Sequence, residues 1–483
     1  MLLVRGAADG VAPGSRSDLS KCRGRDSSKI KLLHADAASL RPKLARGAAK
    51  KETVGGLIIE LINTGSELML GRVTNTHQQW LCRQLADRGY LVRRQVAVAD
   101  TSAQIREAVR ESLGCADLVI TTGGLGPTTD DLTRDEVAAL LGRGLHEDAD
   151  VVAHLENWFV TRKRPMPAST RIQAMVPEGA MVLQNSHGTA PGLVMSADRG
   201  KFGGPPGHEA WLVMLPGPPR ELRPMFLNQV VPWLINRFPP EQPFTCRTLR
   251  TTGIGESMVQ ERIAGPLAQL SAVGLDIGYC ARPGEVDVRL AARGGEGNAI
   301  VRQAEAVVRK EVGNFIFGQE DEPLEAVVIG LLQAKGKSLV VAESCTGGRL
   351  ASRITDVPGA SAVFLGGAVT YANEVKVALL GVSPATLSLH GAVSEETARE
   401  MANGARARFH ADYALAITGI AGPGGGTEDK PVGTVFIALA TSHRTRVVRQ
   451  LNGFDRETFK NVTSQQALEM LRRELLSEHA GPS

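Results

Sequence analysis

A serine and a cysteine stand side by side in VAESCTGG (341–348), directly after an apolar run and directly before residues of helical character. Where a strand ends and a helix starts, backbone N–H groups can stabilise the oxyanion of an acyl-transfer reaction. Gly347 and Gly348 leave room for a substrate over that helix start. Cysteine is the better nucleophile in itself, but it needs a thiolate partner, usually histidine, and none is placed for Cys345. Ser344 needs a base instead.

Two kinds of base are available to this serine, because a free hydroxyl is a poor nucleophile without one. His390 and His410 stand in helix or loop contexts without an obvious partner, and we interpret them as surface or turn histidines. In GGAVTYANEVKVALLGV (366–382), Tyr371 closes an apolar strand and Lys376 begins the next helix. A lysine partly desolvated by apolar walls loses its proton more easily and can act as a base. The alternative is a solvated lysine at a helix start.

A Gly-rich loop, TGIAGPGGGTEDKPVG (418–433), joins two expected strands in the same part of the chain. Its run of glycines carries a high entropy cost for a simple connector, and loops of this kind more often wrap a ligand. Lys430 within the loop and Arg456 beyond it can supply cations to a phosphate. The alternative for both is an ordinary surface charge.

A second Gly-rich stretch, TTGGLGPTTDDLT (121–133), follows a strand and precedes a helix. Its glycines let the backbone approach a phosphate, and the N–H groups at the helix start favour an anion. Asp130 and Asp131 beside such an anion indicate a bridging divalent cation, since carboxylate oxygens suit Mg²⁺ or Mn²⁺. An N-terminal helix cap is the alternative, because aspartate is preferred there as well.

The elements that must position these residues alternate between strands and helices, which is typical of βαβ units and a parallel sheet. The chain has 483 residues, 43% of them hydrophobic and 53 of them glycine. We predict two separate α/β domains with parallel-rich sheets, over 54–222 and 321–483. A small α+β module over 223–320 joins them, without a catalytic cluster and with a spacer or dimerisation role. Residues 199–208 (RGKFGGPPGH) are expected to form a flexible surface insertion.

Basic charge is concentrated at the N-terminus, because residues 1–51 hold twelve Lys and Arg against four Asp. We interpret 1–53 as a disordered leader that is either transit-like or an over-long gene start. The remainder is acidic, so direct nucleic-acid binding is not expected. No apolar run approaches the roughly 18 residues of a membrane span. The six scattered cysteines include no CxxC pair, which favours a cytoplasmic location over a disulfide framework or a zinc site.

The N-terminal stretch resembles the MoaB/MogA-like molybdopterin-binding domain, whose signature is a GG-x-G loop closing on an acidic residue and a threonine. The matching positions are Gly123, Gly124, Gly126, Asp131 and Thr133. TGSELMLGRVTNTHQQWL adds the companion pattern, and PGPPRE (216–221) completes the set.

The longer GGLGPT-x-DD and PGPP-x-E forms resemble those of CinA-type competence/damage-inducible proteins. In that family the domain is associated with metal-dependent ADP-ribose pyrophosphatase activity. The resemblance implies a divalent metal (Mg, Mn or Co) held by Glu67, Asp130 and Asp131, with Asp131 also catalytic. It implies nucleotide contacts from Gly123, Gly124, Gly126, Thr128, Asn75 and Arg220.

The C-terminal motifs are similar to those of the CinA C-terminal domain, the nicotinamide-nucleotide amidase family. AESCTGG, TY-x-NE-x-K, HGAVS and GIAGPGGG-x-x-x-KPVG stand in the family's order. The resemblance implies hydrolysis of nicotinamide mononucleotide with no cofactor, Ser344 being the nucleophile that Tyr371 and Lys376 activate. It implies substrate contacts from Thr346, Gly347, Gly348, Thr418, Gly419, Gly422, Gly424, Gly425, Lys430 and Arg456. One departure is GFDRETFK, where Lys460 replaces a second arginine and loses its bidentate fork.

Together these features predict a cytoplasmic hydrolase, a homodimer by family habit, that acts on two breakdown products of NAD. The C-terminal half deamidates nicotinamide mononucleotide, and the N-terminal half cleaves ADP-ribose. Two alternatives are an adaptor protein of the competence machinery and a molybdopterin-binding protein, each with degenerate catalytic sites.

Overall fold

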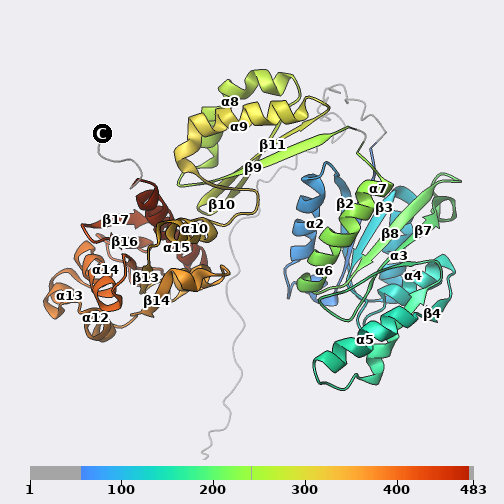
Figure 1. The fold of residues 1–483 in the computed structure, drawn as a ribbon, viewed down its shortest axis with the longest axis horizontal. Coiled ribbons are helices and arrows are strands. Elements are labelled where there is room, and N and C mark those ends of the chain that lie inside the picture. Colours follow the sequence, from blue (N-terminus) through green and yellow to red (C-terminus); the bar gives the residue numbers. More distant parts are fainter. Residues whose placement is uncertain (1–55, 241, 478–483) are drawn as a thin grey trace, which may run out of the picture. The chain divides into compact units, whose positions relative to one another are not determined.

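The computed structural model describes residues 56–240 and 242–477, which form three α/β or α+β regions in chain order (Figure 1). The leader expected over 1–53 lies outside the described residues. Within them, no helix combines the length and the apolar character that crossing a membrane requires. Mixed α/β architecture with a parallel-rich first sheet confirms the fold class predicted from the sequence.

The first region is built on a six-stranded sheet of order β2-β1-β3-β8-β7-β6. Its strands are β1 (Ile59–Thr64), β2 (Val92–Val98), β3 (Leu118–Thr122), β6 (Met181–Leu183), β7 (Gly192–Asp198) and β8 (Glu209–Leu215). β2, β1, β3 and β8 run parallel, β7 pairs antiparallel with β8, and β6 pairs antiparallel with β7. β1 and β3 are buried over their whole length, as expected for central strands covered on both faces.

Helices cover both faces of this sheet (Figure 1). The cluster on one face joins Leu61 of β1 to Leu81 of α2 (Thr76–Ala86), Leu222 of α6 (Pro219–Met225) and Leu234 of α7 (Val231–Arg237). The other face packs against α3 (Ser102–Cys115), α4 (Thr133–Leu141) and α5 (Ala149–Thr161). The remaining short elements are α1 (Ser66–Met69), β4 (Leu145–Glu147), β5 (Met175–Pro177) and the helical turns η1 (Ala168–Ala174), η2 (Arg199–Phe202) and η3 (Phe226–Val230). The core of this sheet thus extends beyond the boundary at 222 expected from the sequence.

The segment 199–208 differs from the flexible insertion that its composition predicts. The buried Arg199 side chain pairs with Asp117 at 2.6 Å, and Asp198 accepts a hydrogen bond from the Gly200 N–H at 2.9 Å. The backbones of Gly204 and Gly114 approach so closely that a side chain at either would collide with the other's segment. Most of this segment is exposed, as expected of a surface insertion, but the Arg199–Asp117 ion pair and close backbone contact anchor it to the domain.

The second region is a four-stranded antiparallel sheet of order β10-β11-β9-β12. Its elements are β9 (Phe244–Thr252), α8 (Glu256–Ala272), β10 (Asp276–Arg282), β11 (Glu285–Arg293), α9 (Gly297–Val312), η4 (Gly313–Phe315) and β12 (Ile316–Gln319). Both helices pack on one face of the sheet, where Ile263 and Val308 meet Leu249 and Val288.

The third region has a mixed sheet of order β14-β13-β15-β16-β17. Its strands are β13 (Leu339–Glu343), β14 (Phe364–Val369), β15 (Tyr413–Gly419), β16 (Thr434–Ala440) and β17 (Thr445–Leu451). β14, β13 and β15 are parallel, and β16 and β17 are antiparallel to the strand before them. Register opposes Glu343 to Val369 on one side and to Ile417 on the other. Ser344 and Thr370, which follow β13 and β14, and Thr418 near the end of β15 therefore lie side by side at one edge.

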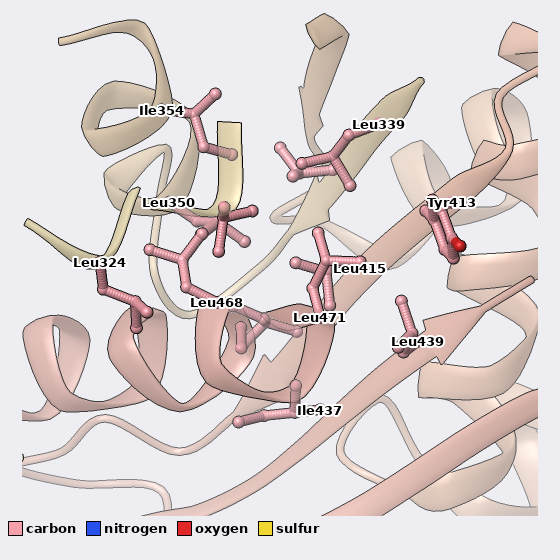
Figure 2. Packing of buried hydrophobic residues seen from close by; sticks show 14 of the residues in the cluster. Leu324, Leu339, Leu350, Ile354, Tyr413, Leu415, Ile437, Leu439, Leu468 and Leu471 are labelled. Carbon is pink, nitrogen blue, oxygen red and sulfur yellow. The ribbon is translucent and has the colours of Figure 1, made fainter. Parts of the chain in front are cut away.

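Two helical layers sandwich this sheet. Figure 2 shows leucines of α10 (Leu324–Lys335), α11 (Arg349–Thr355) and α15 (Arg456–Ser477) meeting Leu339, Leu415 and Leu439 of the strands. The opposite face packs against α12 (Asn373–Leu380), α13 (Pro384–His390) and α14 (Glu395–Phe409), and η5 (Ala360–Ala362) precedes β14. Open α/β sheets bind ligands at the carboxyl ends of their strands, which here are the ends of β13, β14 and β15.

Candidate active sites

The turn after β13 holds the Ser344 side chain at this edge. The Ser344 N–H donates to the Ile417 carbonyl at 2.9 Å, which extends the β13–β15 ladder by one residue. Gly347 and Gly348 then adopt positive φ angles of 60° and 92°, a left-handed turn that side-chain-bearing residues rarely adopt. The chain enters α11 directly afterwards. Ser344 is 9% exposed, so little of it is open to solvent.

Lys376 lies against this serine. Its Nζ is 3.3 Å from Ser344 Oγ, 2.9 Å from the Thr370 carbonyl oxygen and 3.1 Å from the Tyr371 carbonyl oxygen. The residue is only 1% exposed. Burial lowers the pKa of the Lys376 amine, and the nearby Cys345 and Glu374 partly oppose that shift. A neutral amine can donate its two protons to the two carbonyls, which leaves its lone pair for the Ser344 hydroxyl.

Cys345 is placed as a core residue. Its side chain is 6% exposed and belongs to the cluster that contains Leu339 and Leu350. Burial raises the pKa of its thiol to about 12, so the thiolate is not populated at neutral pH. Ser344 therefore faces Lys376, whereas the adjacent Cys345 packs into the hydrophobic core.

The Tyr371 hydroxyl is directed to a different partner from the one the sequence suggests. It accepts a hydrogen bond from Arg456 Nη2 at 2.9 Å, and Arg456 Nη1 donates to the Gly422 carbonyl at 2.8 Å. The Tyr371 side chain is 61% exposed. Its backbone carbonyl, not its hydroxyl, is the group that reaches Lys376.

Glu343, which the sequence did not predict as a site residue, holds the turn after β13 against the start of α11. It is fully buried, and its carboxylate accepts hydrogen bonds from the N–H groups of Gly348 at 3.0 Å, Leu350 at 3.1 Å and Ala351 at 2.8 Å. These N–H groups at the start of α11 are the ones that the sequence predicts as donors to an oxyanion, and here Glu343 occupies them. The signal was present, since an acidic residue before a helix start is a typical cap.

Two of the remaining substrate-contact candidates are bound to backbone carbonyls. Thr418 Oγ1 donates to the Ala392 carbonyl at 2.6 Å, and Lys430 Nζ donates to the His390 carbonyl at 2.9 Å. The buried Thr346 hydroxyl has no hydrogen-bond partner within the described part of the chain. Lys460 reaches the nucleophile turn, because a Cβ built on Gly347 would lie 3.6 Å from its Nζ.

The glycines of the loop after β15 split into two groups. A Cβ built on Gly419 or Gly422 would collide with residues 432–435, so these two allow the loop to fold against β16. No atom would lie within 4 Å of a Cβ on Gly424, and on Gly425 the nearest would be 3.8 Å away. The tip of the loop is therefore open.

In the first region, the loop after β3 lies close to the end of β1. Gly123 and Gly124 have φ angles of 96° and 68°. A Cβ on Gly123 would lie 2.8 Å from the Thr64 hydroxyl, and one on Gly124 would overlap Thr133. The Gly123 N–H donates to the Leu215 carbonyl at 3.0 Å. The two glycines thus bring the loop down onto the carboxyl edge of the sheet.

Asp131 closes this loop upon itself. Its carboxylate accepts hydrogen bonds from the Thr128 N–H at 2.9 Å and from the Thr128 hydroxyl. Gly126 packs against that carboxylate. Because these bonds run back to Thr128 and α4 follows Leu132 without a side-chain cap, Asp131 is not the helix cap of the alternative interpretation.

The carboxylates expected to hold a metal are not gathered. Glu67 lies on α1 and is exposed, as is Asp130. The Thr128 hydroxyl and the residue's own backbone N–H lower the pKa of Asp130. Across residues 56–240 and 242–477, no group of three or more His, Cys, Asp or Glu side chains is arranged to hold a metal ion. As positioned, the three carboxylates do not fit a divalent cation.

Asn75 is held in a helix cap, whereas Arg220 is open to solvent. Asn75 caps α2 through its side-chain oxygen, which accepts the Gln78 N–H at 3.0 Å. The Arg220 side chain is 80% exposed. Its neighbour Glu221, the last residue of PGPPRE, is buried and receives the Asn185 amide at 2.7 Å. Burial raises the pKa of Glu221, which the sequence reading left without a role.

Comparisons with known proteins cover all three regions. Residues 60–236 match the family described as probable molybdopterin binding domain, 246–318 the damage-inducible protein CinA KH domain, and 321–475 the CinA C-terminal domain.

Similar full-length proteins include a putative competence-damage inducible protein of Symbiobacterium thermophilum, 46% identical over 87% of this chain and 99% of that protein. A CinA-like protein of Akkermansia muciniphila is 46% identical over 85% of this chain and 95% of its own length. The crystal structure of competence/damage inducible protein CihA from Agrobacterium tumefaciens is 42% identical, covering 32% of this chain and 93% of that one with a TM-score of 0.31. The chain therefore belongs to the CinA family, with a molybdopterin-binding-type domain, a KH domain and a CinA C-terminal domain.

Proposed function

We propose that the CinA C-terminal domain hydrolyses the carboxamide of nicotinamide mononucleotide, giving nicotinate mononucleotide and ammonia. The observation that carries the proposal is the buried Lys376 amine 3.3 Å from the Ser344 hydroxyl. A lysine whose pKa is lowered by burial is a competent general base for serine. The family membership and the intact motifs support the same reading.

The chemistry balances with these two side chains and one water. Ser344 Oγ attacks the carboxamide carbon while Lys376 takes the hydroxyl proton. The C–N bond then breaks as that proton passes to the departing nitrogen, which releases ammonia and forms a serine ester. Water, deprotonated by the same amine, cleaves the ester to the carboxylate and restores Ser344.

Charge on the oxyanion and on the phosphate requires separate donors. Glu343 engages the N–H groups of Gly348, Leu350 and Ala351, so these three donors are not assigned to the oxyanion. For the phosphate we assign Arg456 and Lys460, cations at the N-terminal turns of α15.

The test is ammonia release from purified protein supplied with nicotinamide mononucleotide. Ser344→Ala should abolish release, and Cys345→Ala should retain most of it. An inactive wild type, under conditions where a reference amidase turns over, would contradict the proposal and favour an adaptor role of the competence type. A Cys345→Ala variant that is inactive beside an active Ser344→Ala variant would reverse the nucleophile assignment.

For the molybdopterin-binding-type domain we propose ADP-ribose pyrophosphatase activity dependent on a divalent cation (Mg, Mn or Co). The observation that favours it is the close backbone approach of Gly123 and Gly124 at the carboxyl edge of the sheet, a usual place for a phosphate. Because the described carboxylates do not form a metal cluster, no chemical step is assigned to them. ADP-ribose cleavage that survives EDTA would exclude the metal, and tight molybdopterin binding without cleavage would favour the alternative.

Two properties of the whole protein stay proposals: a homodimer, and a cytoplasmic location. Light scattering on the purified chain tests the first, and cell fractionation tests the second.

A further inference from the structure

Arg456 joins three parts of the amidase site through one guanidinium group. Nη2 donates to the Tyr371 hydroxyl after β14, and Nη1 donates to the Gly422 carbonyl in the loop after β15. Arg456 itself begins α15. Both acceptors are neutral, whereas a guanidinium forms stronger, bidentate bonds with a phosphate. A phosphate at this position therefore competes directly for the groups that hold Tyr371.

Tyr371 connects this arginine to the reacting atoms. Its hydroxyl is bound by Arg456, and its backbone carbonyl accepts the Lys376 amine at 3.1 Å. The same amine lies 3.3 Å from Ser344 Oγ. Hydrogen bonds therefore connect Arg456, the residue proposed to bind the phosphate, through Tyr371 and Lys376 to Ser344.

The Tyr371 side chain is free to respond. It is 61% exposed, so few packing contacts oppose its displacement. Lys376, in contrast, is buried, and any change in its carbonyl partners alters how its lone pair faces Ser344. The exposed Tyr371 side chain thus contacts Arg456, whereas the buried Lys376 amine contacts Ser344.

We propose that the phosphate of the substrate activates the amidase by drawing Arg456 away from Tyr371. Phosphate binding then changes the position of the base, Lys376, in addition to increasing the affinity for the substrate. The proposal rests on the proposed amidase function and specifies its substrate class: nucleotides bearing a phosphate monoester react, and their dephosphorylated ribosides bind but react slowly. Binding energy from a remote group is then used to raise kcat, not only to lower KM.

The test separates the phosphate from the rest of the substrate. Ammonia release is measured with nicotinamide mononucleotide, with nicotinamide riboside, and with the riboside in the presence of phosphite dianion. In the wild type, phosphite should raise kcat/KM for the riboside saturably, by about 5- to 150-fold, the usual range of coupling between two sites. The mononucleotide should exceed the riboside chiefly in kcat.

Two variants and a control locate the effect. Arg456→Ala should remove phosphite activation and bring the mononucleotide close to the riboside. Tyr371→Phe keeps the backbone carbonyl but lacks the acceptor for Arg456, so the riboside should react faster without phosphite and phosphite should add no further activation. The KM for the mononucleotide should change little. Arg444→Ala is the matched control, because this exposed arginine pairs with Glu474 and contacts neither Tyr371 nor the loop after β15. It should retain full phosphite activation.

The outcomes distinguish this inference from the function on which it rests. If the wild type hydrolyses the mononucleotide but phosphite has no effect on the riboside, the coupling is wrong and the amidase function stands. Activation that persists in Arg456→Ala contradicts the role of that residue. If the wild type hydrolyses neither compound, both the function and the coupling are overturned.

Discussion

At the scale of single residues, the environment of Lys376 decides what the site can do. An exposed lysine is protonated at neutral pH and cannot take a proton from serine. Here burial lowers the pKa, and the carbonyls of Thr370 and Tyr371 use the two protons that a neutral amine can donate. The sequence predicted the Ser–Lys pairing from residue types, but helix-start spacing alone left a solvated lysine as the alternative. Burial among helices distant in sequence excludes that alternative.

The first prediction concerns pH. Because the neutral form of Lys376 is the base, kcat/KM should rise with pH along a limb whose midpoint lies below the usual lysine pKa of 10.5. Glu374 raises the pKa of this amine, so Glu374→Gln should shift the limb to lower pH without lowering the plateau. pH–rate profiles of the two proteins check the shift. An unshifted or upward-shifted limb in the variant would show that another group titrates.

The second prediction concerns Cys345. Since burial raises the pKa of its thiol to about 12, iodoacetamide at pH 8 should leave it unmodified and leave the amidase active. The exposed Cys115 and Cys280 should be alkylated under the same conditions and serve as internal controls. Peptide mass mapping measures all three. Rapid labelling of Cys345 with loss of activity would mean that this residue faces the substrate.

At the scale of elements, three parallel strand ends and one helix start build the site. The pairing of β13 with β14 and β15 aligns Ser344, Thr370 and Thr418, and Glu343 ties the end of β13 to the first turn of α11. Strand ends and the order of the motifs could be read from the sequence, because apolar runs followed by glycine mark them. The direction of Tyr371 and the capping by Glu343 could not, since each depends on a partner that only the folded sheet supplies.

The third prediction tests the cap. Glu343→Gln loses charge-assisted hydrogen bonds in a fully buried position, which should cost about 1–3 kcal/mol of stability and should lower kcat, because the turn that carries Ser344 loosens. Asp412→Asn is the matched control. Asp412 accepts the Ser338 N–H and hydroxyl at the other end of β13. It should lower the melting temperature while sparing kcat, and equal kcat losses in both variants would argue for a general loss of stability.

At the scale of the whole molecule, the family assignment and the alternation of strands and helices were accessible from the sequence, whereas some strands were not. The short strands β4, β5 and β6, the antiparallel strand β7 and the strand β17 were not among the strands predicted from the sequence. These strands have mixed or brief apolar patterns, so local sequence does not distinguish them from loops. The same holds for Glu67, Asp130 and Asp131 of the first domain. Their motifs predict a shared metal site, but among the described residues these carboxylates do not form one.

The last prediction follows from separate cores. The residues around Leu61 and Leu222 and those around Leu339 and Leu415 form distinct hydrophobic clusters, one in each α/β domain. Substitutions in one site should therefore leave the other unchanged, as for residues that share no partners. In the full-length chain, Ser344→Ala should abolish ammonia release and retain ADP-ribose cleavage. Asp131→Ala should do the reverse, because it releases the loop after β3 from its bonds to Thr128. The double variant should show both losses with no further fall in either melting transition. Loss of ADP-ribose cleavage in Ser344→Ala would show instead that the two sites are coupled or that one site serves both substrates.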